Sequence, residues 1–192
     1  MANFATTLPL DTFFERVSPN TSKSVSVNVI EGHGIVQVFA ANSKSAAIER
    51  ALKIKASPGV ATIGSGYTAI PLSPGQWMVI SGKIGSNGFA DQIRSKIKKN
   101  GYVSEQSDGR VIFRIGGSRA RELMRKGCRL DLHPSSASKG WCAQTQMAQA
   151  GVIIHQVDDK PTYDVLVFSG FAQHFAEWLE HTGAQLGISF SR

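Results

Sequence analysis

Apolar residues at every second position mark the first strands of the chain. The set comprises Val25, Val27, Val29, Ile35, Val36, Val38 and Phe39. This period is typical of strands with one buried face, and Gly32-His33-Gly34 supplies turn residues between the two runs. Residues 25–40 are therefore predicted to form a β-hairpin or a pair of strands. A further short strand is predicted over Gln76–Ile80, behind Pro74-Gly75.

Apolar residues spaced three or four apart predict four helices, over residues 43–55, 87–99, 118–126 and 171–182. Such spacing places the apolar side chains on one stripe that faces a core. In the second helix the stripe is Phe89, Ile93 and Ile97. In the last helix it consists of Phe171, Phe175, Trp178 and Leu179.

The second half of the chain adds strands over residues 102–106, 110–115, 141–147, 152–157 and 162–168. Ser107-Asp108-Gly109 is a turn signal that predicts a hairpin between the first two of these. The mixed order of elements favours an α+β fold with antiparallel or mixed sheets and packed helices. Residues 1–24 are predicted to be an N-terminal arm. Residues 25–192 are predicted to be a single α+β unit, divisible into sub-domains 25–108 and 109–192.

Composition narrows the class of protein. In 192 residues, 42% are apolar and 18% are charged, which excludes a disordered chain. The two cysteines do not form a disulfide framework. No apolar run approaches the roughly 18 residues of a membrane span, and the first residues show no targeting segment. We therefore expect a cytoplasmic protein that does not enter a membrane.

The formal net charge of +7 is concentrated in the middle of the chain, over residues 83–99 and 110–129. Such a surface can attract nucleic acid, an anionic cofactor or an acidic protein. Single-strand binders interleave exposed aromatic residues with basic ones. Here Phe89 falls on a buried helix stripe and Phe113 in an apolar strand. An RNA-binding module is therefore not the function that the pattern favours, and no nucleic-acid partner is predicted.

Cys128, Asp131, His133 and Cys142 form the most reactive-looking group of the sequence. The close ligand pairs that zinc sites use are absent from it. A catalytic Cys–His pair stays open as an alternative, because a thiolate needs a nearby base. Free cysteines are more often simply buried, and His133, before Pro134, can orient its loop by hydrogen bonding. We predict no catalytic, cofactor-binding or metal-binding residue.

Four other histidines, His33, His155, His174 and His181, lack a second titratable group at convincing local spacing. Asp158-Asp159 lies in a turn before Lys160-Pro161, and a turn needs nothing more from these carboxylates. No paired-carboxylate site is therefore indicated.

The second half of the chain contains a series of motifs: Gly117–Met124, Lys126-Gly127-Cys128, Asp131-Leu132-His133-Pro134, Cys142-Ala143-Gln144-Thr145, Tyr163–Val167, Phe171-Ala172 and Trp178-Leu179. Together these motifs resemble the gamma subunit of heterotetrameric sarcosine oxidase. The resemblance covers about residues 110–187. Ser169-Gly170 departs from it, because such proteins usually show Arg-Ser there.

The resemblance implies a fold similar to the folate-binding domain of aminomethyltransferases, and a non-catalytic structural or assembly subunit. In the parent complex an alpha subunit holds FAD and NAD and has a folate-binding region. A beta subunit carries the substrate site and FMN, and a delta subunit binds zinc. The complex oxidatively demethylates sarcosine and transfers the one-carbon unit to tetrahydrofolate. The implied partners of this chain are the alpha, beta and delta subunits.

The alternative is a stand-alone folate-binding protein of the aminomethyltransferase-like fold. A pteridine site needs a carboxylate that can bind the amino-imine edge of the ring. Asp131 is the candidate for that role in this sequence.

Overall fold

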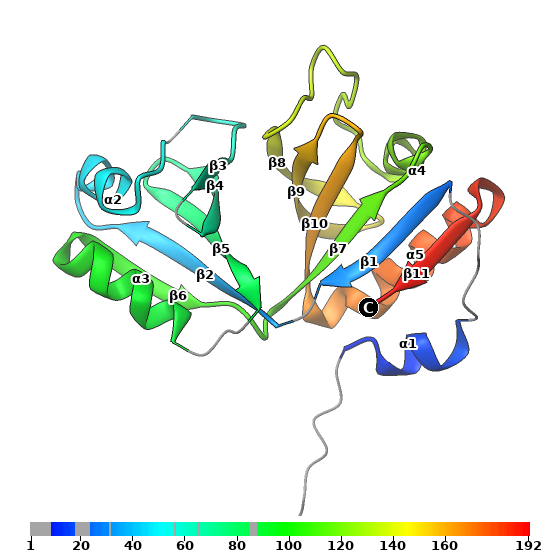
Figure 1. The fold of residues 1–192 in the computed structure, drawn as a ribbon, viewed down its shortest axis with the longest axis horizontal. Coiled ribbons are helices and arrows are strands. Elements are labelled where there is room, and N and C mark those ends of the chain that lie inside the picture. The colour runs from blue at the N-terminus through cyan, green and yellow to red at the C-terminus, as the bar shows by residue number, and fades with distance from the viewer. Residues whose placement is uncertain (1–8, 18–23, 31, 56, 65, 85–87) are drawn as a thin grey trace, which may run out of the picture.

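The computed structural model describes residues 9–17, 24–30, 32–55, 57–64, 66–84 and 88–192. Within these ranges the strands form two sheets that lie side by side (Figure 1). The six-stranded sheet has the order β11-β1-β7-β10-β9-β8, with β1 Val25–Ile30, β7 Arg110–Gly116, β8 Cys142–Met147, β9 Ala150–Asp158, β10 Thr162–Phe168 and β11 Ile188–Ser191. The five-stranded sheet has the order β3-β4-β5-β2-β6, with β2 His33–Ala40, β3 Thr62–Gly64, β4 Tyr67–Ser73, β5 Gln76–Ile84 and β6 Gly101–Glu105.

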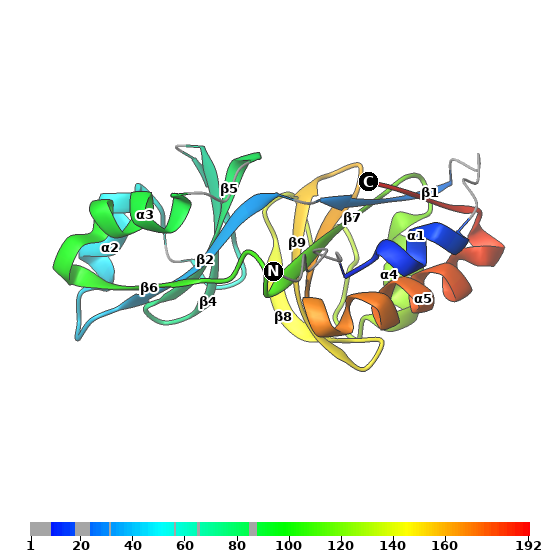
Figure 2. The same ribbon diagram turned by 90° about the horizontal axis from the view of Figure 1, so that it is seen from below.

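Helices cover the outer faces of both sheets, so the molecule is built in four layers (Figure 2). The helices are α1 Asp11–Arg16, α2 Ser45–Leu52, α3 Phe89–Ile97, α4 Ala120–Gly127 and α5 Ala172–Gly183, and the 3₁₀ turns are η1 Lys98–Asn100, η2 Ser169–Phe171 and η3 Ala184–Leu186. Helices α2 and α3 share one buried cluster with the five-stranded sheet. Helices α4 and α5 share another with the six-stranded sheet. A third cluster joins the inner faces of the two sheets. This confirms the predicted α+β class.

Strand alternation explains which face each sheet turns inward. Val25, Val27 and Val29 of β1 enter the cluster beneath α4 and α5. In β2, Val36 and Val38 face α2 and α3, whereas Ile35 faces the other sheet. Successive side chains of a strand point to opposite faces, so one strand can serve two clusters.

Neither predicted hairpin forms, although the strands exist, and residues 25–40 form the pair of strands that their pattern also predicted. Strand β1 pairs with β7 and β11, whereas β2 pairs with β5 and β6. Strand β6 likewise remains in the five-stranded sheet, and β7 crosses to the other one. Turn residues shape the local bend, but the partner of a strand is chosen by the apolar face that it can bury. The chain therefore crosses between the two sheets twice, from β1 to β2 and from β6 to β7.

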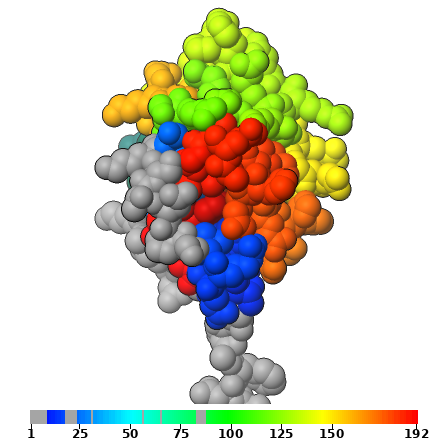
Figure 3. Space-filling view, turned by 90° about the vertical axis from the view of Figure 1, so that its right-hand side faces the viewer, coloured from blue at the N-terminus to red at the C-terminus, as the bar shows by residue number. Residues whose placement is uncertain are grey.

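The N-terminal helix α1 lies against the C-terminal part of the chain (Figure 3). Phe13 is buried and its ring contacts that of Phe190 at 5.0 Å between centroids. Arg16 bonds the carboxylates of Glu177 and Glu180 on α5. Residues 9–17 of the predicted arm are thus covered by the chain itself. Residues 1–8 and 18–23 of that arm lie outside the described residues.

Several elements differ from the predictions in extent. Strands β3, β4 and β11 have no predicted counterpart, and β5 runs beyond Ile80. Phe171 is 50% exposed and does not belong to the buried stripe of the last helix, because η2 precedes α5 there. No helix in the described ranges is both long and apolar enough to cross a membrane.

Candidate functional site

The two cysteines of the predicted reactive group lie in different clusters. Cys128 follows α4 in the cluster beneath the helices, and Cys142 begins β8 in the cluster between the sheets. Both are free and buried. Burial raises the pKa of the Cys128 thiol, and it raises the pKa of Cys142 to about 11. Neither thiol is poised to ionise near neutral pH.

Asp131 and His133 stabilise the loop in which they lie by hydrogen bonding. One carboxylate oxygen of Asp131 accepts the backbone N–H of His133 at 2.9 Å, and the other accepts the Ser136 hydroxyl at 2.6 Å. These bonds, that of Ser136 first, lower the pKa of Asp131. The His133 ring is bonded through Nδ1 to the Ser135 hydroxyl at 2.7 Å. These hydrogen bonds all lie within residues 131–136, so they stabilise an exposed turn.

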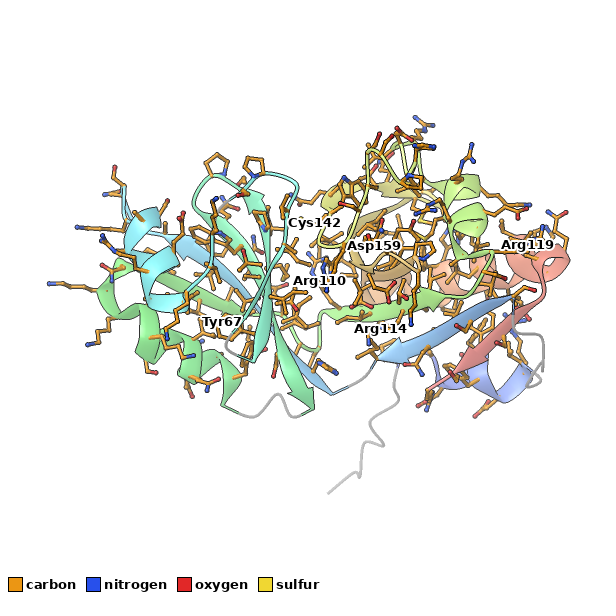
Figure 4. The ribbon with its side chains drawn as sticks, turned by 45° about the horizontal axis from the view of Figure 1, so that its top comes forward. Tyr67, Arg110, Arg114, Arg119, Cys142 and Asp159 are labelled. Carbon is orange, nitrogen blue, oxygen red and sulfur yellow. The ribbon has the colours of Figure 1, made fainter. Side chains whose placement is uncertain are left out.

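A polar row that local spacing did not reveal crosses the inner face of the six-stranded sheet. Strand register places Asn28 opposite Arg114, Arg114 opposite Asp164, and Asp164 opposite His155. Cys142 follows opposite His155. Figure 4 shows Arg114 and Cys142 on the six-stranded sheet, toward the five-stranded sheet. Asn28 and Asp164 of this row are 136 positions apart in the sequence, so only the sheet brings these residues together.

The centre of this row is a bidentate ion pair. Arg114 Nε donates to one oxygen of Asp164 at 2.7 Å, and Arg114 Nη2 donates to the other at 2.8 Å. The hydrogen bonding to Asp164 raises the pKa of Arg114. The Asp164 side chain is 12% exposed. A paired, planar arrangement of this kind fixes both side chains in place.

His155 lies between this ion pair and Cys142, and it is 3% exposed. Burial lowers the pKa of His155, although the Asp164 carboxylate acts in the opposite direction. The Nε2 atom of His155 makes no hydrogen bond with the described residues. A neutral imidazole beside a neutral thiol does not provide the thiolate that nucleophilic catalysis needs.

A groove of about 500 Å³ opens beside Cys142, between α2, the turn joining β4 and β5, and β8. Its walls include Glu49, Pro58, Pro74, Cys142 and Gln144. Glu49 supplies a carboxylate to this groove, whereas Asp131 is not among the lining residues. The predicted role of Asp131 toward a pteridine therefore has no support from this cavity. The described residues contain no cluster of three His, Cys, Asp or Glu side chains that could hold a metal ion.

Asp158 and Asp159 stabilise the turn between β9 and β10 by accepting hydrogen bonds. Asp158 accepts the backbone N–H groups of Lys160 and Thr162, both at 2.9 Å. Asp159 accepts the backbone N–H of Lys139 at 2.8 Å. These carboxylates close the turn between β9 and β10 onto the loop before β8, in agreement with the predicted turn.

Comparison with known protein families gives one match that spans most of the chain. The family described as "Sarcosine oxidase, gamma subunit family" matches residues 37–185. Comparison with curated protein sequences gave no significant match.

Solved structures that share the fold include a chain of a sarcosine oxidase and an aminomethyltransferase. One is a chain of the heterotetrameric sarcosine oxidase from Corynebacterium sp. U-96 in complex with pyrrole 2-carboxylate, with a TM-score of 0.80 and 19% identity over 94% of this chain and 96% of that one. The other is the aminomethyltransferase T of the glycine cleavage system from Bartonella henselae, with a TM-score of 0.71 and 11% identity. The match covers 96% of this chain and 58% of the aminomethyltransferase. The expected similarity to aminomethyltransferases is thus confirmed at the level of the fold.

Proposed function

This chain belongs to the sarcosine oxidase gamma subunit family, and on that premise we propose that it is a non-catalytic subunit of a sarcosine-oxidase-like heterotetrameric flavoenzyme. The observation that carries the proposal is the family match over residues 37–185. The end-to-end fold similarity to a chain of one such heterotetramer supports it. The role of the chain is to hold the other subunits in their working arrangement.

The burial and the hydrogen bonding of the candidate reactive side chains support a non-catalytic role. Cys142 is buried with a pKa of about 11, His155 is buried, and both Asp131 oxygens are engaged within their own loop. A catalytic site needs a titratable group that can meet substrate in the correct protonation state. Cys142 and His155 are shielded from solvent, and the hydrogen bonds of Asp131 hold its carboxylate within its own loop.

In the proposed complex the redox chemistry belongs to the partner chains. FAD, NAD and a folate-binding region are assigned to an alpha subunit, FMN and the substrate site to a beta subunit, and zinc to a delta subunit. The complex would oxidise sarcosine in the cytoplasm and pass the one-carbon unit to tetrahydrofolate. This chain contributes contacts and no cofactor of its own.

The test is gentle purification of the tagged chain from its native cell. We expect a flavin absorption spectrum and three further polypeptides of different mass to co-elute with it. A colourless single chain would contradict the subunit role. Titration of that isolated chain with tetrahydrofolate, followed by intrinsic fluorescence, would then decide in favour of the stand-alone folate-binding alternative or against it.

A further inference from the structure

An aromatic and cationic surface lies where β7 begins and β10 ends. Arg110 and Phe168 are register partners at these strand ends. The backbone N–H of Ser169 donates to the carbonyl of Gly109 at 3.0 Å, which holds the 168–171 turn against the start of β7. Figure 4 shows Arg110 near the middle of the molecule, on the same strand as Arg114. We refer to Arg110, Phe168 and Phe171 as the Arg110 surface.

Two large rings of this surface are exposed to solvent. Phe168 is 46% exposed and Phe171 is 50% exposed, and both belong to one short turn of the chain. The Arg110 guanidinium lies over the Phe168 ring, 3.9 Å from its centroid. This stacking restrains the arginine side chain before any partner arrives. A partner that docks here therefore meets a pre-arranged group.

The Arg110 guanidinium has no counter-charge among the described residues. Burial lowers the pKa of Arg110, and no carboxylate acts against that effect. Its Nε atom is buried and makes no hydrogen bond with the described residues. Arg114 and Arg119, in contrast, each bond a carboxylate of this chain through two nitrogens. A cation that is partly removed from water without a partner costs free energy, which a neighbouring carboxylate would recover.

We infer that the Arg110 surface is a docking site for a neighbouring subunit, which supplies a carboxylate to Arg110 and an apolar patch to the two phenylalanine rings. The inference rests on the proposed function, because it assumes that such a subunit exists. Arginine and aromatic side chains dominate the binding energy of protein interfaces. The planar guanidinium suits bidentate bonding to a carboxylate.

The charge of the chain favours an acidic partner over a second copy of itself. At a formal net charge of +7, two copies repel each other, whereas an acidic surface is attracted. The exposed apolar rings also distinguish this surface from a site for a small anion, which would not cover them. The occupant is thus a folded protein surface with carboxylates near its apolar centre.

The experiment measures binding of this chain to the remaining subunits of the purified complex. Arg110→Ala and the pair Phe168→Ala/Phe171→Ala should each raise the dissociation constant by at least about tenfold, because each removes an interface anchor. Arg110→Lys should weaken binding as well, because lysine keeps the charge but loses the planar fork. The matched control is Tyr102→Ala, which truncates an aromatic ring that is 71% exposed on β6 of the other sheet.

The results distinguish a failure of the docking inference from a failure of the proposed subunit role. If the wild-type chain binds and all the Arg110-surface variants bind equally well, the inference is overturned while the subunit role stands. If the wild-type chain binds no flavin-containing partner, the proposed function itself has failed. Each isolated variant must keep the wild-type thermal midpoint, so that lost binding reports the interface and not misfolding. Loss of self-association in place of subunit binding would also overturn the inference.

Discussion

Cys142 and His155 lie opposite each other on neighbouring strands, but burial removes the charges that a catalytic pair would need. The Cys142 thiol, with a pKa of about 11, is almost fully protonated at neutral pH. The sequence left a Cys–His pair open, with His133 as the nearby histidine. Register instead places His155 across from Cys142, a neighbour that local spacing cannot reveal because strand pairing selects it.

Burial of Cys142 predicts slow alkylation in the folded chain. An ordinary cysteine has a pKa near 8.5, so the thiolate fraction of Cys142 below pH 8 should be lower by more than about 100-fold. Iodoacetamide labelling followed by peptide mass spectrometry should show this difference between the folded and the urea-denatured chain. Equal rates in both states would show that Cys142 is accessible and ionised, which would revive the catalytic alternative.

Burial of His155 predicts that the chain loses stability in mild acid. The pKa of His155 is lowered in the folded state, chiefly by burial and further by Arg114, while Asp164 opposes the shift. As pH falls through about 6.5, His155 is therefore protonated in the unfolded chain before it is protonated in the folded chain. The free energy of unfolding should decrease between about pH 7.5 and 5.5, above the range in which carboxylates titrate.

Urea unfolding at several pH values measures this effect. The His155→Gln variant should show a flatter dependence on pH, because it has removed the group responsible. His181→Gln, which changes an exposed histidine of α5, should retain the wild-type slope. The same slope in the His155→Gln variant and the wild type would show that another group controls the acid sensitivity.

Among the secondary-structure elements, the apolar stripe of each helix could be predicted from the sequence. The residues of other elements that pack against each stripe could not. Phe89, Ile93 and Ile97 are buried on α3, as their spacing predicted. Trp178 shares the stripe of α5 with the fully buried Phe175, but Trp178 is half-buried. The Trp178 ring lies at the end of α4, where Gly127 approaches it closely. Helical period cannot report which residue of another helix meets the stripe.

The contact between Gly127 and Trp178 predicts a specific coupling. A Cβ atom added at Gly127 would lie 2.5 Å from the Trp178 ring, so Gly127→Ala should destabilise the chain by about 1–3 kcal/mol. Alanine otherwise favours a helix by about 1 kcal/mol over glycine. In a Trp178→Ala background the same change should therefore cost little or even stabilise. A double-mutant cycle of denaturant unfolding measures the coupling. Additive effects would show that the ring does not limit this position.

The whole molecule is held together where its two sheets face each other. Ile35 and Met78 of one sheet share a buried cluster with Ile112 and Leu166 of the other. The Gln144 side chain also donates to the carbonyl of Leu72 at 2.7 Å. The two chain crossings, between β1 and β2 and between β6 and β7, add covalent connections at this junction. We therefore expect the two halves to unfold together. The boundaries predicted for the sub-domains, 25–108 and 109–192, do not coincide with the two sheets, because β1 Val25–Ile30 lies in the six-stranded sheet.

Tryptophan fluorescence can test this cooperativity. Trp77 is buried in the five-stranded sheet, whereas Trp141 and Trp178 belong to the other half. In a variant that retains Trp77 alone, and in one that lacks it alone, the midpoint from fluorescence should coincide with the midpoint from far-UV circular dichroism of the same variant. Met78→Ala should lower both midpoints together, by about 2–5 kcal/mol in free energy of unfolding. Two separate transitions would show instead that the halves fold independently.

The long helices, most of the strands and the resemblance to the gamma subunit family could be predicted from the sequence. These depend on the spacing of apolar residues and on motifs, which are local properties of the chain. The strand partners, the row from Arg114 to Cys142 and the isolation of the Arg110 charge became visible only in the folded chain. Val29 and Phe113, for example, pair across more than 80 residues. Such pairings follow from the burial of whole faces, and no local pattern encodes which distant segment will cover a given face.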